Sequence, residues 1–265
     1  MGRFSRLISC FFLLVFALPL LAQPSEVRTV PSPMRIAPPS DTATAPELEG
    51  EGDNLRAQKF YLDSIDYYRA ALKKSDTAIL HNKAGISYLQ LQRSKEAKKE
   101  FQDAIKLDHN YPEAFNNLGV LQYKNQKYGS AIKEYNRALK MAETNASFHS
   151  NLGTAYFANK DYEKATREFS RALELDPAIF ENHPSAGVAA RLVSSNDLGR
   201  FHYVMAQMYG QKGDVEKCRY YLSKANEDGY SVRDALRDSV FADMRKDPSF
   251  VSFVRSLKTP PSDNN

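Results

Sequence analysis

The stretch "NLGTAYFANKDYEKATREFSRALELDP", residues 151–177, decides the fold because its small and aromatic residues recur elsewhere at a fixed interval. The interval is 34 residues, and it relates four columns: Gly85, Gly119 and Gly153; Ala97, Ala131 and Ala165; Phe101, Tyr135 and Phe169; Ala104, Ala138 and Ala172. Four columns that keep one period over three units indicate an internal repeat, because coincidence does not supply them.

Each unit reads as two amphipathic helices. Apolar residues recur at spacings of three and four, as in "AIKEYNRALKM" (131–141), and short polar turns such as "NQK" (125–127) separate the two halves. A glycine inside a helix costs about 1 kcal/mol relative to alanine. The glycine column therefore predicts that the second helix of the hairpin passes close, with the alanines facing that crossing. The aromatic column is expected to fill the space toward the next unit.

This pattern resembles the tetratricopeptide repeat, a helix-turn-helix unit of the same length with the same small and aromatic residues. The resemblance is close over 78–179 and weaker in the flanking stretches 53–74 and 201–229. It implies an all-α fold, a right-handed α-solenoid of about five hairpins. Four repeats are expected over 47–179 and a divergent fifth over 199–232, with an irregular insertion at 180–198.

The N-terminal region is expected to consist of a cleaved signal peptide followed by a linker in an extended conformation. Residues 1–22 combine two arginines with an apolar run and end in Ala22, which is typical of a secretory signal peptide. An uncleaved anchor is the alternative, but the run is shorter than the ~20 residues that span a bilayer. Residues 23–46 hold six prolines among Ser, Thr and Ala, and they read as a flexible linker.

The C-terminal region repeats a short motif: "DSVFADM" (238–244) and "DPSFVSF" (247–253) lie nine residues apart. Asp238 and Asp247 read as helix caps before apolar faces. A stack of repeats exposes an apolar end, so residues 233–258 are predicted to be capping helices, and a docking motif for another protein is the alternative. Residues 259–265 read as a disordered tail.

Composition and motifs argue against an enzyme and against nucleic acid. The formal net charge of +4 falls to +2 once Arg3 and Arg6 leave with the signal peptide, which is too balanced for a nucleic-acid binder. Metalloprotease, nucleophile-elbow and phosphate-loop motifs do not occur. His81 and His149 sit two repeats apart, too far to share a metal ion. Neither a cofactor nor a metal site is predicted.

One cysteine, Cys218, remains after cleavage, so no intramolecular disulfide can form. It occupies a place that other repeats fill with Ala or Ser. A packing role is therefore expected, and a reactive thiol is the alternative.

The first helices carry far less charge than the second helices. "ASFHSNLGTAYFA" (146–158) carries none, whereas "SKEAKKEFQDAIKL" (94–107) carries seven charged residues. In the tetratricopeptide family the first helices line a concave groove that grips peptides or helices. The resemblance therefore implies a partner-binding groove, in which Tyr123 and Phe157 would be solvent-facing aromatic anchors. By the repeat register the groove would display Ile79, Asn82, Ile86, Leu89, Asn116, Val120, Tyr123, Lys124, Ser150, Thr154 and Phe157.

A subset of the family holds the carboxylate end of chaperone tails with paired basic residues in this groove. Here the corresponding places hold Glu49 and Asp53 in the first repeat and Asn82 with Ile86 in the second, so that ligand is disfavoured.

The function expected is therefore that of an exported, periplasmic or secreted, non-enzymatic adaptor that binds a peptide or helix of a protein partner. Peripheral association with a membrane complex and a role as a regulatory module of an envelope machine remain open. The alternative is a structural protein whose repeats stack end to end into homo-oligomers.

The signal-peptide assignment predicts that the exported protein begins close to Gln23, because the apolar run is too short to span a membrane and a proline-rich stretch follows it. Mass spectrometry of the purified protein measures its N-terminus. Membrane-embedded protein that retains Met1 would contradict the assignment.

Overall fold

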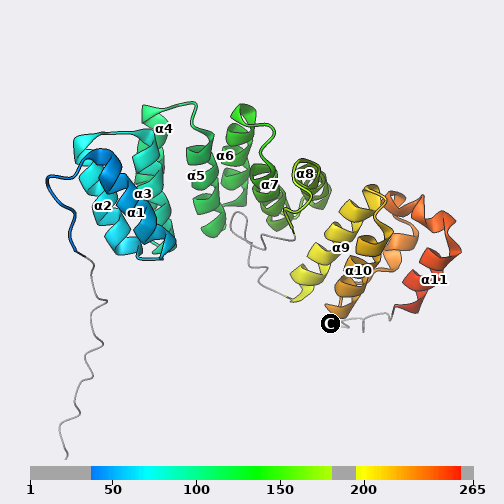
Figure 1. Cartoon of the computed structure of the whole chain (residues 1–265). Coiled ribbons are helices and arrows are strands. Elements are labelled where there is room, and N and C mark those ends of the chain that lie inside the picture. The colour runs from blue at the N-terminus through cyan, green and yellow to red at the C-terminus, as the bar shows by residue number, and fades with distance from the viewer. Residues whose placement is uncertain (1–36, 181–194, 258–265) are drawn as a thin grey trace, which may run out of the picture. The chain divides into compact units, whose positions relative to one another are not determined.

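The computed structural model describes residues 37–180 and 195–257, and these are helical or irregular throughout (Figure 1). The predicted signal peptide (1–22), most of the predicted linker, residues 181–194 of the predicted insertion and the predicted C-terminal tail lie outside the described residues. Within the described part, no helix is long and apolar enough to cross a membrane.

Consecutive helices pair into hairpins, as the 34-residue period predicts. Their bounds are α1 (Ala45–Ala57) with α2 (Tyr61–Lys74), α3 (Ala78–Gln90) with α4 (Ser94–Leu107), α5 (Pro112–Lys124) with α6 (Tyr128–Met141), α7 (Ala146–Ala158) with α8 (Tyr162–Leu175), and α9 (Ser195–Gln211) with α10 (Val215–Glu227). The all-α solenoid of helical hairpins is thus confirmed.

The turns inside the hairpins share one backbone conformation, in which a single residue has a positive φ angle. In the second hairpin Gln92 adopts a left-handed conformation, with φ of 60°, and the N–H of Arg93 then donates to the carbonyl of Tyr88 at 2.9 Å. Lys59, Gln126 and Lys160 take the same place in the first, third and fourth hairpins, and Gly213 takes it in the fifth. This closure satisfies carbonyls at the end of the first helix and reverses the chain within three residues.

The glycine column lies against the aromatic column of the same hairpin. A Cβ added to Gly119 would lie 2.7 Å from Cε1 of Tyr135, and the pairs Gly52–Tyr68, Gly85–Phe101 and Gly153–Phe169 repeat this geometry. The aromatic Phe169 also reaches the next unit as expected, where its ring centroid lies 5.9 Å from that of Phe201 on α9. A ring edge, rather than the backbone of the second helix, occupies the room that a side chain would need.

The first four hairpins stack in one direction. Ser64 at the start of α2 hydrogen-bonds Ser87 near the end of α3 at 2.8 Å, so these neighbouring helices are antiparallel. The fifth hairpin joins differently. Arg200 near the start of α9 lies 4.4 Å from the ring of Tyr162 at the start of α8.

A contact between the later parts of α8 and α9 indicates the same direction. Ser170 in the second half of α8 donates to Gln211 at the end of α9 at 3.2 Å. Helices α8 and α9 thus contact start to start and end to end, opposite to α2 and α3. The fifth hairpin enters the stack in the reverse direction, a feature that the repeat pattern did not predict.

The C-terminal segment covers the fifth hairpin with three 3-10 turns, η1 (Arg233–Leu236), η2 (Ser239–Phe241) and η3 (Met244–Lys246), followed by α11 (Pro248–Ser256). Asp238 caps η2 and Asp247 caps α11, as predicted. The first copy of the nine-residue motif forms 3-10 turns instead of the expected helix. Phe241, Phe250 and Val254 are completely buried.

The last residues of the predicted linker belong to the folded part. Thr44 forms a capping box with Glu47, so α1 begins at Ala45, inside the predicted linker. The residues before it lie along α2, where Lys74 donates to the carbonyl of Asp41 at 2.8 Å and the hydroxyl of Tyr67 donates to the carbonyl of Ala37 at 3.1 Å.

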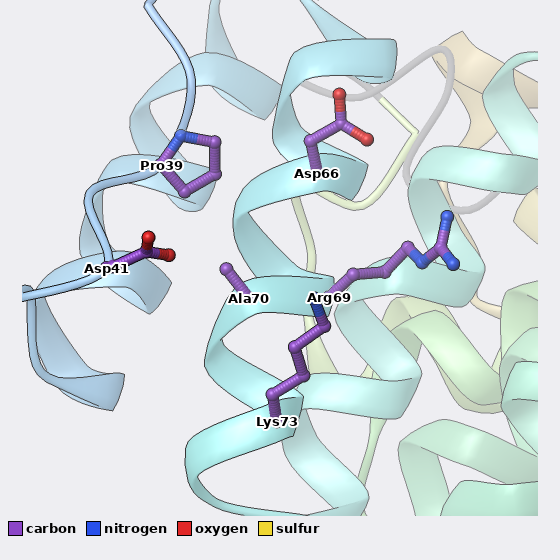
Figure 2. Close-up of a pocket in the computed structure, with 6 residues that line it drawn as sticks. All are labelled: Pro39, Asp41, Asp66, Arg69, Ala70 and Lys73. Carbon is purple, nitrogen blue, oxygen red and sulfur yellow. The ribbon is translucent and has the colours of Figure 1, made fainter.

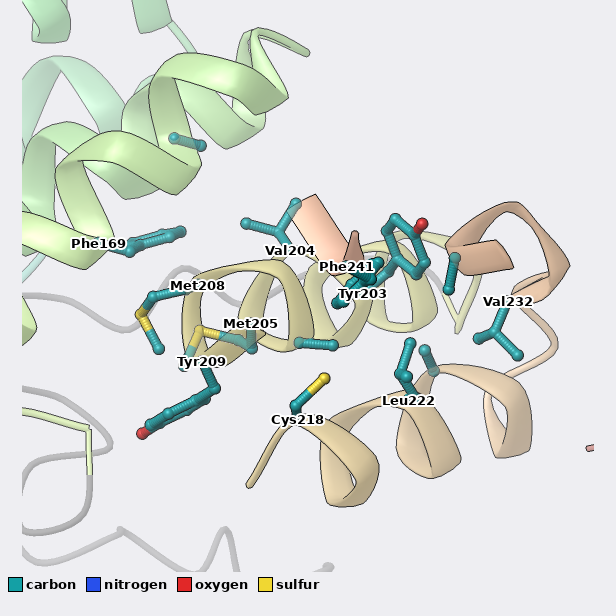
Figure 3. Close-up of a cluster of buried hydrophobic side chains, with 14 of the residues drawn as sticks. Phe169, Tyr203, Val204, Met205, Met208, Tyr209, Cys218, Leu222, Val232 and Phe241 are labelled. Atoms are coloured by element: carbon teal, nitrogen blue, oxygen red, sulfur yellow. The ribbon is translucent and has the colours of Figure 1, made fainter. Parts of the chain in front are cut away.

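An apolar cluster surrounds α9 and joins it to the fourth hairpin (Figure 3). Figure 3 shows Phe169 of α8 beside Met208 and the Cys218 side chain directed toward α9. Cys218 is completely buried at the alanine place of its repeat. Burial raises the pKa of its thiol to about 12, so the thiolate is scarce at neutral pH. These observations favour packing over reactivity.

We expect Gly119→Leu to destabilise the fold by about 2–4 kcal/mol, because the new side chain must displace the buried ring of Tyr135. Gly129→Ala is the matched control, since no atom lies within 4 Å of a Cβ added there. The fifth hairpin places Ala206 and Leu222 at these column positions, so Tyr135→Leu should offset part of the cost of Gly119→Ala. Chemical denaturation of the single and double variants measures this coupling. Equal midpoints for Gly119→Leu and wild type would contradict the contact.

Cys218 should resist alkylation in the folded protein, because its thiol is both buried and protonated. The measurement is iodoacetamide labelling of a Cys10→Ser full chain at pH 8, followed by mass spectrometry. Labelling should become complete only in denaturant. Fast labelling of the folded chain would restore the reactive-thiol hypothesis.

Candidate partner-binding face

The predicted groove residues lie on α3, α5 and α7, but they differ in accessibility. Six of them reach solvent, and we call this set the first-helix face: Ile79, Ile86, Tyr123, Lys124, Ser150 and Thr154. Five others are buried: Asn82, Leu89, Asn116, Val120 and Phe157. The register therefore places all eleven on first helices, and packing between hairpins removes nearly half of them from direct contact with a partner.

The buried asparagines form a ladder that links three first helices. Asn117 on α5 donates to Oδ1 of Asn82 on α3 at 2.9 Å, and Asn151 on α7 donates to Oδ1 of Asn116 at 2.9 Å. Asn82 also donates to the hydroxyl of Tyr111 at 3.2 Å. These amides bind neighbouring hairpins instead of standing free, because an unpaired buried amide would cost about 1–3 kcal/mol.

A charged network continues the ladder toward α1. Nζ of Lys83 lies 2.5 Å from Glu49 and 2.5 Å from Asp53, and the hydroxyl of Tyr68 donates to Asp53 at 2.7 Å. Burial opposes the ionised form of Asp53, but the hydrogen bonds from Lys83 and Tyr68 prevail and lower its pKa. Burial likewise opposes the charged form of Lys83, yet its two carboxylate partners raise the pKa.

This network is consistent with the absence of a basic clamp. Lys83 stands one residue beyond Asn82 on the same helix, and both of its carboxylate partners come from its own chain. An acidic ligand would have to displace Glu49 and Asp53 to reach that ammonium group.

Phe157 differs from the expectation of a solvent-facing anchor. It is 5% exposed and packs edge-on against Tyr162 at 5.4 Å and Phe201 at 5.6 Å. The reversed entry of α9 brings Phe201 onto the end of α7, which encloses the ring. Tyr123 is partly buried and contacts Tyr128 at 5.4 Å, and burial raises its pKa to about 12.

The equivalent face of α9 is covered by the chain itself. Tyr203, Gln207 and Gly210 take the places of Ser150, Thr154 and Phe157 in the fifth repeat. Gln207 and Tyr203 donate to the carboxylate of Asp238 at 2.6 and 3.2 Å, and a Cβ on Gly210 would lie 2.9 Å from the ring of Phe241. The first-helix face therefore ends at α7.

The repeat histidines bind acceptors within their own hairpins. Nδ1 of His81 lies 2.5 Å from Glu100, Nδ1 of His149 lies 2.7 Å from Glu168, and Nδ1 of His202 lies 2.6 Å from Asp228. The hydrogen bond with Glu100 raises the pKa of His81. In the described part of the chain, no three His, Cys, Asp or Glu residues gather as metal ligands would.

A shallow pocket of about 340 Å³ lies between α2 and the segment before α1 (Figure 2). Pro39 and Asp41 stand on the segment, and Asp66, Arg69 and Lys73 stand on α2. The lining mixes both charge signs and holds no nucleophile with a neighbouring base. The sequence did not single out this pocket, because one wall comes from the segment before α1, which lies outside the repeat pattern.

The comparisons with known proteins agree with the hairpin architecture. A family model described as "Tetratricopeptide repeat" matches residues 50–112, 82–146 and 116–178. No curated protein matches the chain.

Among solved structures, PilF of Pseudomonas aeruginosa has a similar fold, with a TM-score of 0.52 and 18% identity over 79% of this chain and 88% of that chain. MamA from Desulfovibrio magneticus, from residue 41 to its end, gives a TM-score of 0.50 and 18% identity over 72% of this chain and 96% of that chain. At these identities the likeness concerns the fold alone. The glycine and aromatic columns, the hairpin stack and the family match lead to one conclusion: through residues 50–178, the chain belongs to the tetratricopeptide-repeat family.

Proposed function

We propose that the protein is an exported, non-enzymatic adaptor that binds an extended peptide or a helix of a protein partner on the first-helix face. The observation that carries this proposal is the contrast between the two helix layers. Five of the six residues of the first-helix face are apolar or hydroxyl-bearing, whereas the second helices α4, α6 and α8 carry dense charge. Tetratricopeptide repeats are protein-interaction modules, and the first-helix face reaches solvent in the part of the chain that the structure describes.

The face offers both apolar area and polar contacts to a partner. Ile79 on α3 is 50% exposed. Ile86 on the same helix and Tyr123 on α5 are partly exposed. Ser150 and Thr154 add polar groups on α7. Side chains with few rotatable bonds lose little entropy on binding, so Tyr123 is a suitable anchor.

The polar ladder behind the face supports a rigid binding surface. Its asparagines and the Lys83 network fix the positions of successive first helices relative to one another. The face is therefore already ordered before a partner binds. Preorganisation of this kind raises affinity, because less conformational entropy is lost on binding.

Export and an envelope setting extend this proposal. The apolar run in residues 1–22 supports export to the periplasm or the exterior, and the proline-rich stretch after it would give the repeats reach. Partners in the assembly or regulation of an envelope complex would then be accessible.

End-to-end stacking has less support as a function. The C-terminal segment packs Phe241, Phe250 and Val254 against the last hairpin, where all three are buried. It therefore covers the apolar surface that the last repeat would otherwise offer to a second copy. Light scattering over a range of concentrations measures self-association directly, and growth in mass with concentration would favour the stacking hypothesis.

We expect the double variant Ile79→Glu, Thr154→Glu to lose most partner capture while its helix content and melting stay near those of wild type, because both side chains reach solvent in the free protein. Affinity capture with crosslinking from envelope extract, quantified by mass spectrometry, measures the loss. Circular dichroism measures the folding.

Leu107→Glu provides the matched control. Leu107 is 48% exposed, close to the 50% of Ile79, but it lies at the end of a second helix. It should leave capture unchanged. Equal capture by the double variant and this control would refute the first-helix face as the binding surface.

A further inference from the structure

Arg200 on α9 lies close to two aromatic rings. Its guanidinium carbon lies 4.4 Å from the ring centroid of Tyr162 on α8 and 5.2 Å from that of Tyr230, which follows α10. The side chain is partly buried. The attraction between a cation and an aromatic ring stabilises the guanidinium group at this place and does not use its N–H donors in hydrogen bonds.

The other ring-stacked arginines of the described residues have carboxylate partners of their own. Arg93 stacks on Tyr88 and pairs with Glu96, Arg137 stacks on Phe115 and pairs with Glu134, and Arg219 stacks on Phe253 beside Asp247. Within the described ranges, Arg200 makes neither a hydrogen bond nor an ion pair. Among the described residues, its positive charge therefore has aromatic contacts and no carboxylate partner.

Two acids on the elements around Arg200, Asp228 and Asp238, have hydrogen-bond partners other than Arg200, and Asp234 lies near Tyr230. Asp228, at the end of α10, pairs with His202 at 2.6 Å, and Asp238 accepts from Gln207 and Tyr203. A guanidinium group that has no acid partner among the described residues is suited to bidentate binding of a carboxylate.

The position of Arg200 relates it to the partner-binding face. Tyr162, which stacks on Arg200, also packs against Phe157 at the end of α7. The ring of Tyr162 therefore connects the guanidinium group of Arg200 to the end of α7, where the first-helix face ends. It reaches this place because α9 enters in the reverse direction and brings its start to the start of α8.

We propose that Arg200 binds a carboxylate group of the partner at the α7 end of the first-helix face. This inference rests on the proposed function and adds the chemistry of one partner group to it. The carboxylate is either an acidic side chain or the chain terminus of the bound peptide, and both present the same planar pair of oxygens. Lys83, at the opposite end of the face, is occupied by Glu49 and Asp53, so the carboxylate is recognised at the α9 end.

Arginine side-chain NMR on the full chain tests this proposal. The Nε–Hε signal of Arg200, assigned by its loss in Arg200→Lys, is followed during titration with N-acetylglycine and with the α-amide of N-acetylglutamic acid. The first probe presents a chain-terminal carboxylate and the second a side-chain carboxylate. Sodium chloride at equal ionic strength provides the salt control. The Nε–Hε signals of Arg93 and Arg137 provide matched internal controls, because these stacked arginines already have acid partners.

We expect a saturable shift of the Arg200 signal with at least one probe and no comparable shift at Arg93 or Arg137. The probe that saturates at the lower concentration identifies the source of the carboxylate. An Arg200 signal that moves no more than that of Arg137, or that moves equally with sodium chloride, overturns the proposal.

The small probes separate this proposal from the proposed function. If Arg200 responds saturably but the double variant Ile79→Glu, Thr154→Glu captures as much partner as wild type, the first-helix face is refuted as the binding surface and carboxylate binding by Arg200 stands. If that variant loses capture but Arg200 does not respond, only carboxylate binding by Arg200 is refuted.

Discussion

The contact between an aromatic ring and a bare glycine Cα inside each of the first four hairpins is the constraint on which the rest of the structure depends. In the first four hairpins a side-chain atom at the glycine would meet the ring of Tyr68, Phe101, Tyr135 or Phe169 at under 3 Å. The two helices can pack around that ring only if one of them carries no Cβ at the crossing. Because the same contact recurs in each of these units, these hairpins have nearly the same shape and can stack in register.

Register between the hairpins then depends on polar contacts. The asparagine ladder joins α3, α5 and α7, and the network around Lys83 joins α1 to α3. These contacts use groups that the family resemblance had assigned to a partner. Their burial has two effects: it connects successive first helices, and it leaves a smaller, less polar first-helix face exposed. The extent of that face thus follows from how the repeats contact each other.

The reversed fifth hairpin accounts for the features that depart from a regular repeat array. It encloses Phe157, it stops the first-helix face at α7, and it places Arg200 against Tyr162. The C-terminal segment in turn covers the corresponding face of α9 through Asp238 and Phe241. One change in chain direction therefore limits the binding surface and adds a charged group at its edge.

The sequence by itself determined the hairpins and their number, because glycine, alanine and aromatic columns have a local cause that spacing reveals. It also located the caps Asp238 and Asp247 and the packing role of Cys218. The tertiary structure alone decided which groove residues stay accessible, since Asn82 and Phe157 have surface-compatible positions in the register and become buried only when neighbours arrive. It alone decided the direction of α9 as well. The residues between α8 and α9 break the period, so no spacing relates the two helices, and their packing is set by long-range contacts between aromatic side chains.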